Sequence, residues 1–158
     1  MHITRGFTLI ELMVTIAVLA IAIAIAVPSF TSVIQSNRTT SLNQEMLGTI
    51  QLARSEAVKR RKDVIICRTE NQSVCANGTN WAAGWLVREV GGDVVKVWDP
   101  VAGMALTGPN TGVVFHSSGM AEAVASFTAT TSSCTSGSKY TIDVSLTGSA
   151  TTNKTGCP

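Results

Sequence analysis

The chain has 158 residues, of which 14% are charged, and its formal net charge is +2. Typical soluble domains contain about 25% charged residues, so this chain is unusually poor in charge. Its length allows one domain of ordinary size with an appendage, and a charge this small does not by itself indicate a nucleic-acid partner.

The first element is an apolar run, GFTLIELMVTIAVLAIAIAIAVPSF at residues 6–30, which contains a single carboxylate, Glu11. As a helix, residues 7–27 are long enough to cross a bilayer core. A charge at the centre of such a helix costs about 3 kcal/mol on insertion scales, so an acid there needs a partner and a task. Pro28 removes a backbone hydrogen bond and is expected to kink or loosen the helix.

Three interpretations of this N-terminus compete. One is a secretory signal peptide cleaved after the small-x-small sequence Ala24-Ile25-Ala26, and another is a permanent membrane anchor. Neither has a use for Glu11 inside its apolar segment. The third interpretation, based on residues 5–12, gives the acid a role.

The sequence RGFTLIEL at residues 5–12 resembles the class III leader of type IV pilins and pseudopilins. The resemblance implies a leader peptide, residues 1–6, that a prepilin peptidase/methyltransferase removes between Gly6 and Phe7 before it methylates the Phe7 amine. It also implies that Glu11 faces the Phe7 amine of a neighbouring subunit. That pair attracts strongly in a low dielectric, whereas an unpaired Glu11 stays costly. The acid therefore favours assembly with other major and minor pilins over a lone position in the inner membrane.

Beyond the predicted membrane-spanning and filament-core helix, residues 7–28, the same helix is expected to continue as an amphipathic half, residues 29–62. Its apolar residues recur at a spacing close to 3.6; they are Phe30, Val33, Ile34, Leu42, Met46, Ile50, Ala53 and Ala57. The helix is expected to end at a run of four cations, Lys59, Arg60, Arg61 and Lys62. The helix dipole favours cations there, and the same run is a candidate patch for an anionic partner.

Residues 63–158 are expected to form a β-rich head. Five runs rich in β-branched or aromatic residues are separated by Gly, Asn, Pro and Ser; they are DVIICR (63–68), GWLVRE (84–89), DVVKVWD (93–99), GVVFHS (112–117) and KYTIDVSL (139–146). GGD at 91–93 is a hairpin signal. We therefore predict an α+β fold, in which a long N-terminal helix packs against two small antiparallel sheets.

Two further stretches, IQLARSEAVKRRKDVIICR at 50–68 and WAAGWLV at 81–87, resemble the GspH/FimT family of minor pilins and pseudopilins, most closely its FimU/FimT-like minor pilins. The resemblance implies a minor type IV pilin that supports pilus initiation and pilus-dependent motility, adhesion or uptake. The alternatives are a DNA-binding minor pilin for natural transformation and a type II secretion pseudopilin. The implied location is the inner membrane with a periplasmic head, and then an extracellular pilus or periplasmic pseudopilus.

The four cysteines indicate disulfides in an oxidising compartment, because their spacings are too wide for the paired ligands of a zinc site. Of three pairings that the sequence leaves open, we expect Cys67 with Cys75 and Cys134 with Cys157. The first bond closes a local loop after a strand. The second pins the Ser/Thr-rich C-terminal tail and resembles the C-terminal disulfide loop of type IV pilins.

The sequence contains no motif of an enzyme, so we predict no catalytic site, no cofactor and no metal. A nucleic-acid partner is not favoured either. DNA-binding relatives of the FimT type have a Gly-Arg-x-Arg motif near the C-terminus, but the corresponding residues 148–151 read Gly-Ser-Ala-Thr. Trp81, Trp85 and Trp98 are candidates for surface contacts, although core packing is the more frequent position for tryptophan.

Overall fold

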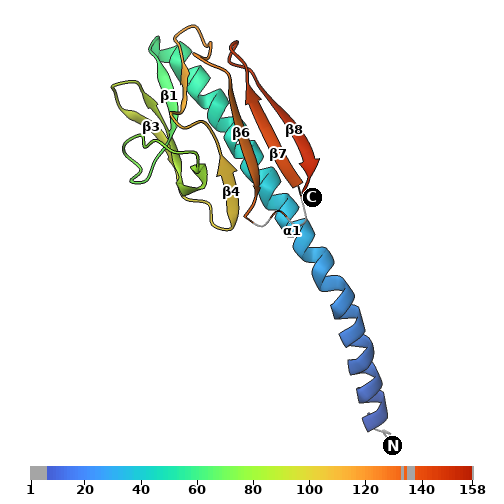
Figure 1. Ribbon diagram of the computed structural model, residues 1–158. Coiled ribbons are helices and arrows are strands. Elements are labelled where there is room, and N and C mark those ends of the chain that lie inside the picture. The colour runs from blue at the N-terminus through green and yellow to red at the C-terminus, as the bar shows by residue number, and fades with distance from the viewer. Residues whose placement is uncertain (1–6, 133, 135–137, 158) are drawn as a thin grey trace, which may run out of the picture. The chain divides into compact units, whose positions relative to one another are not determined.

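The computed structural model describes residues 7–132, 134 and 138–157. In these residues it has one long helix, α1 (Leu9–Arg60), a short 3-10 turn, η1 (Trp81–Ala83), and eight strands (Figure 1). The strands form two antiparallel sheets of four, which confirms the predicted α+β class. By internal contacts the chain divides into two units, Met1–Ile34 and Gln35–Pro158.

The first unit consists of the apolar part of α1. The side chains from Leu9 to Val27 are exposed. The helix is long and apolar enough to cross a membrane. So much exposed apolar surface is stable only in lipid or against another protein. The backbone is assigned as helical through position 28, and the kink expected at Pro28 stays a prediction.

The first sheet of the second unit has the strand order β3-β2-β1-β5. Its strands are β1 (Val64–Arg68), β2 (Trp85–Glu89), β3 (Val94–Trp98) and β5 (Val113–Phe115). All four lie within runs that the sequence predicted. The predicted hairpin joins β2 to β3, where the Glu89 N–H donates to the Asp93 carbonyl at 3.1 Å. Gly91 has a φ of 72° in that turn, a conformation that favours glycine.

The second sheet has the strand order β4-β6-β7-β8. Its strands are β4 (Met104–Thr107), β6 (Ala125–Thr131), β7 (Ser138–Val144) and β8 (Ala150–Gly156). Only β7 was predicted from the sequence. In β6 the buried Phe127 and Ala129 alternate with less buried serine and threonine side chains, so the strand has one apolar face and one polar face.

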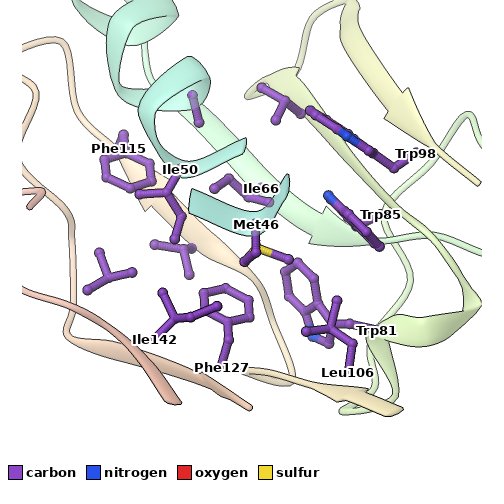
Figure 2. Close-up of a cluster of buried hydrophobic side chains, with 14 of the residues drawn as sticks. Met46, Ile50, Ile66, Trp81, Trp85, Trp98, Leu106, Phe115, Phe127 and Ile142 are labelled. Atoms are coloured by element: carbon purple, nitrogen blue, oxygen red, sulfur yellow. The ribbon is translucent and has the colours of Figure 1, made fainter. Parts of the chain in front are cut away.

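Both sheets and the residues of α1 within the second unit share one hydrophobic core. Figure 2 shows Met46 of α1 beside the ring of Trp81 and Ile50 of α1 beside the ring of Phe115, and all four side chains are fully buried. The rings of Trp81 and Phe127 meet edge to face with centroids 4.9 Å apart. Burial of each large apolar side chain contributes about 1.5–3 kcal/mol, so this cluster is a main source of the head's stability.

The three tryptophans belong to the core and not to an exposed contact surface. Trp81 and Trp85 are fully buried, and Trp98 is 9% exposed. Trp85 stacks on Trp98 with centroids 5.8 Å apart, and its indole N–H donates to the Thr49 hydroxyl at 3.2 Å. Trp81 lies in η1 before β2 begins, so it does not share a regular strand with Trp85.

Candidate functional site

The start of α1 is a capped helix terminus. The helix begins at Leu9, after Phe7 and Thr8. The Glu11 N–H donates to the Thr8 hydroxyl oxygen at 3.3 Å, and the Leu12 N–H donates to the Thr8 carbonyl at 3.2 Å. Thr8 is therefore the N-cap residue, which satisfies donors that the first turn leaves without partners.

Glu11 lies in this first turn with an exposed side chain. Among the residues that the structure describes, none makes an ion pair with its carboxylate. The neighbouring surface consists of exposed apolar side chains, including Leu9, Ile10 and Leu12. A carboxylate on such a surface is costly in lipid unless a cation from elsewhere approaches it. The arrangement is suited to binding a cationic group of another molecule.

The predicted processing junction lies at the border of the described residues. Gly6 falls outside them, whereas Phe7 is described and its side chain is 77% exposed. Phe7 precedes the helix, so its backbone N–H is not needed for the hydrogen bonds within α1. Cleavage between Gly6 and Phe7 stays a prediction.

The basic run at the end of α1 is partly neutralised within the chain. Glu56 accepts hydrogen bonds from Arg60 at 2.6 Å and from Lys59 at 3.3 Å. The hydrogen bond from Arg60 is the main reason that the pKa of Glu56 lies below its ordinary value, although burial of the carboxyl opposes the shift. The same contact raises the pKa of Arg60.

The other two cations of the run lie beyond the helix. Lys62 forms an ion pair with Glu89 of β2. Arg61 is exposed and has a φ of 55°, an uncommon conformation for a residue other than glycine. Of the four cations predicted as a patch for an anionic partner, Arg61 alone has no acidic partner among the described residues. Two carboxylates, Glu56 and Glu89, therefore offset part of the positive charge of these four cations.

The segment that replaces the Gly-Arg-x-Arg motif begins in the turn between β7 and β8. Gly148 has a φ of 75°, and its N–H donates to the Ser145 carbonyl at 2.9 Å. The sequence did not indicate that Arg54 of α1 comes close to this turn. A Cβ atom added to Gly148 would lie 3.3 Å from the Arg54 Nε, so one guanidinium lies beside a turn that contains no cation of its own.

The structure joins Cys67 to Cys75 and Cys134 to Cys157, with Cα atoms 5.5 Å and 5.2 Å apart. The first bond confirms the predicted local loop after β1, which a hydrogen bond from the Ala76 N–H to the Arg68 carbonyl also closes. The second ties the end of β8 to the segment before β7. In the described part of the chain, no group of three or more His, Cys, Asp or Glu residues could hold a metal ion.

Two family models match the sequence. The model of the type II transport protein GspH matches residues 43–148, and the model of the prokaryotic N-terminal methylation motif matches residues 1–27. The first match covers more than half of the chain and includes most of the second unit. No curated protein sequence matches the chain significantly.

Two crystal structures of the type IV minor pilin FimU from Pseudomonas aeruginosa are similar to the chain. One is 16% identical with a TM-score of 0.56, and the match covers 72% of this chain and 91% of the other. The second is 17% identical with a TM-score of 0.59, and the match covers 74% and 89%. At this level of identity the likeness shows the fold alone.

Proposed function

The chain belongs to the family of the type II transport protein GspH, and on that premise we propose that it is a minor type IV pilin. Its role is structural: it supports pilus initiation and pilus-dependent motility, adhesion or uptake. The family and the fold are those of structural pilins. The N-terminal methylation motif over residues 1–27 and the exposed apolar start of α1 support insertion in a membrane before assembly.

One observation carries this proposal: the exposed Glu11 carboxylate has no cationic partner among the described residues. Removal of residues 1–6 creates a cationic amine at Phe7, and Glu11 of an adjacent pilin is its partner. The pair compensates the cost of each charge in an apolar surrounding. Assembly into a filament is thereby favoured over residence as a single subunit in the inner membrane, with the head in the periplasm.

A second candidate is a pseudopilin of a type II secretion system. The family model that matches residues 43–148 describes a type II transport protein, which favours this function. Pilins and pseudopilins share the processed apolar N-terminus, so the start of α1 does not distinguish them. Their difference lies in the partner subunits, which in both cases are other pilin-like proteins.

Deletion of the gene in its native host tests both functions when three phenotypes are measured together. For a minor pilin, we expect loss of twitching motility and of surface pili with normal exoprotein secretion. Loss of secretion with normal pili indicates the pseudopilin. A defect restricted to transformation indicates DNA uptake, for which the basic run gives limited support because Glu56 and Glu89 offset part of its charge.

Complementation provides the control. The wild-type gene should restore the lost phenotype, whereas a gene encoding Glu11→Gln should not, because the variant lacks the charge on which the proposed assembly contact depends. A deletion strain that behaves normally in all three measurements contradicts the minor-pilin proposal and the pseudopilin alternative together.

A further inference from the structure

The chain itself covers one edge of each sheet. In the first sheet, Ala121 forms a β-bridge with Phe115 of the edge strand β5. In the second sheet, Asn80 forms a β-bridge with Thr107 of the edge strand β4. The outer edges of β3 and β8 have no such partner among the residues that the structure describes.

The two open edges differ in length and regularity. Natural edge strands are usually protected from pairing by shortness, bulges or charges. The pairing of β2 with β3 shifts register between Val87 and Arg88, and β3 has five residues. In contrast, β8 has seven residues, pairs with β7 in an unbroken register, and contains one charged side chain, Lys154. Figure 1 shows β8 as the outermost strand of its sheet.

The hydrogen bonds of the β7–β8 hairpin show which backbone groups of β8 face outward. The Ser145 N–H donates to the Ser149 carbonyl at 2.9 Å. Bonded and non-bonded pairs alternate along an antiparallel ladder, so the pairs of β7 with Thr151, Asn153 and Thr155 are the next bonded ones. The N–H and C=O groups of Thr152 and Lys154 therefore point away from β7, toward the open edge.

This edge is held in place along its length. The turn at Gly148 fixes one end of β8, and the Cys134–Cys157 disulfide fixes the other. Between them, the Thr152 hydroxyl donates to the buried Asn43 side-chain oxygen of α1 at 2.9 Å. A strand already fixed in extended form loses little further conformational freedom when a partner pairs with it.

We propose that the open edge of β8 is a docking site for an extended strand of a neighbouring pilin subunit, with a carboxylate opposite Lys154. Outward N–H and C=O groups that repeat every second residue are complemented by another extended polypeptide backbone. This interaction rests on the proposed function, because it supplies the neighbouring subunit. It adds a contact in the head to the contact of Glu11 at the N-terminus.

Charge selects the partner strand. The Lys154 ammonium lies 5.7 Å from the centroid of the Tyr140 ring, and no described carboxylate forms an ion pair with it. The other lysine of this hairpin, Lys139 of β7, pairs with Thr155, so its side chain lies on the opposite face of the sheet from Lys154. An edge lysine discourages indiscriminate pairing, whereas a strand that places Asp or Glu opposite it is favoured.

Three substitutions of one residue in the full-length protein test the site in its native host. Lys154→Pro removes the outward N–H without removing a ladder bond to β7, because proline is tolerated where an edge N–H faces solvent. Lys154→Ala is the matched control, since it also lacks the ammonium but keeps the N–H. Lys154→Glu reverses the charge. The measurement is the amount of each variant in sheared filaments relative to its amount in membranes.

We expect the relative filament content of Lys154→Pro to be about fivefold below that of Lys154→Ala, because one hydrogen bond and the space for a partner strand are lost. Lys154→Glu should also fall below Lys154→Ala. Equal filament contents of the proline and alanine variants overturn the proposal when the Cys134–Cys157 bond still forms. If the proline variant does not fold, a glutamate variant that equals or exceeds the alanine variant overturns it instead. Absence of the wild-type protein from filaments contradicts the proposed function itself.

Discussion

The Thr8 hydroxyl oxygen accepts a hydrogen bond from the Glu11 N–H at 3.3 Å, so the acid and the helix cap are neighbours. A threonine followed three residues later by a glutamate is the capping-box pattern, and an acid in the first turn also interacts favourably with the helix dipole. Glu11 thus has a local role at the helix start as well as its proposed role between subunits. Substitutions at these two positions separate the roles.

Glu11→Gln should leave the protein in the membrane but lower its amount in sheared filaments by roughly tenfold or more, because an ion pair in low dielectric is lost. The glutamine keeps the size of the side chain and its ability to form hydrogen bonds. Thr8→Val is the control, since it removes the cap and keeps the carboxylate. Quantitative immunoblots of membranes and sheared filaments measure both. If Thr8→Val and Glu11→Gln are equally depleted from filaments, the helix start and not the charge determines assembly.

The purified protein should begin at N-methylated Phe7, because the sequence around Gly6 and Phe7 resembles the leader junction of type IV pilins. Mass spectrometry of the intact protein and of its N-terminal peptide gives the answer. A mature N-terminus at Val27 indicates an ordinary signal peptide instead. Gly6→Leu should accumulate uncleaved protein, since a large side chain obstructs the approach of the peptidase to the backbone.

The sequence was sufficient to predict α1 and the first sheet because both have clear periodic signals. Apolar residues such as Met46 and Ile50 recur at helical spacing, and the strands of the first sheet are rich in valine, isoleucine and tryptophan. The cap at the start of α1 has a sequence signal as well. The pattern of Thr8 and Glu11 was visible in the sequence.

Most of the second sheet could not be predicted because its strands have little apolar signal of their own. In β6 only Phe127 is a large apolar residue, and in β8 every residue after Ala150 is exposed. These strands exist because β7 and the shared core hold them, a tertiary effect that local sequence does not reveal. The position of Arg54 beside Gly148 likewise depends on packing between distant segments.

Glu56→Gln should lower the Tm of the full-length protein in detergent at neutral pH by about 2–4 °C. This is the size expected for the loss of two ordinary surface ion pairs, here those with Lys59 and Arg60. The pKa of Glu56 is lowered in the folded state, chiefly by the hydrogen bond from Arg60. Its stabilisation is therefore present above the unfolded pKa of about 4.5 and is lost as the pH falls through the lower folded value. The difference in Tm between wild type and variant should shrink below that pH. A difference that stays constant down to pH 3 contradicts the assignment.

Removing the Cys134–Cys157 bond by serine substitution at both positions should destabilise the head more than removing the Cys67–Cys75 bond. The two bonds join residues 23 and 8 positions apart, for which the chain-entropy model gives about 3.4 and about 2.5 kcal/mol. The longer bond also anchors β8, whose exposed residues bury too little apolar surface to hold the strand in place. Loss of that bond should therefore make β8 accessible to proteases before the rest of the head, and limited proteolysis with mass spectrometry detects this. Non-reducing peptide mapping of the wild type provides the reference. Peptides that link Cys67 to Cys134 or Cys157 contradict the pairing, and preferential cleavage outside β8 contradicts its dependence on the disulfide.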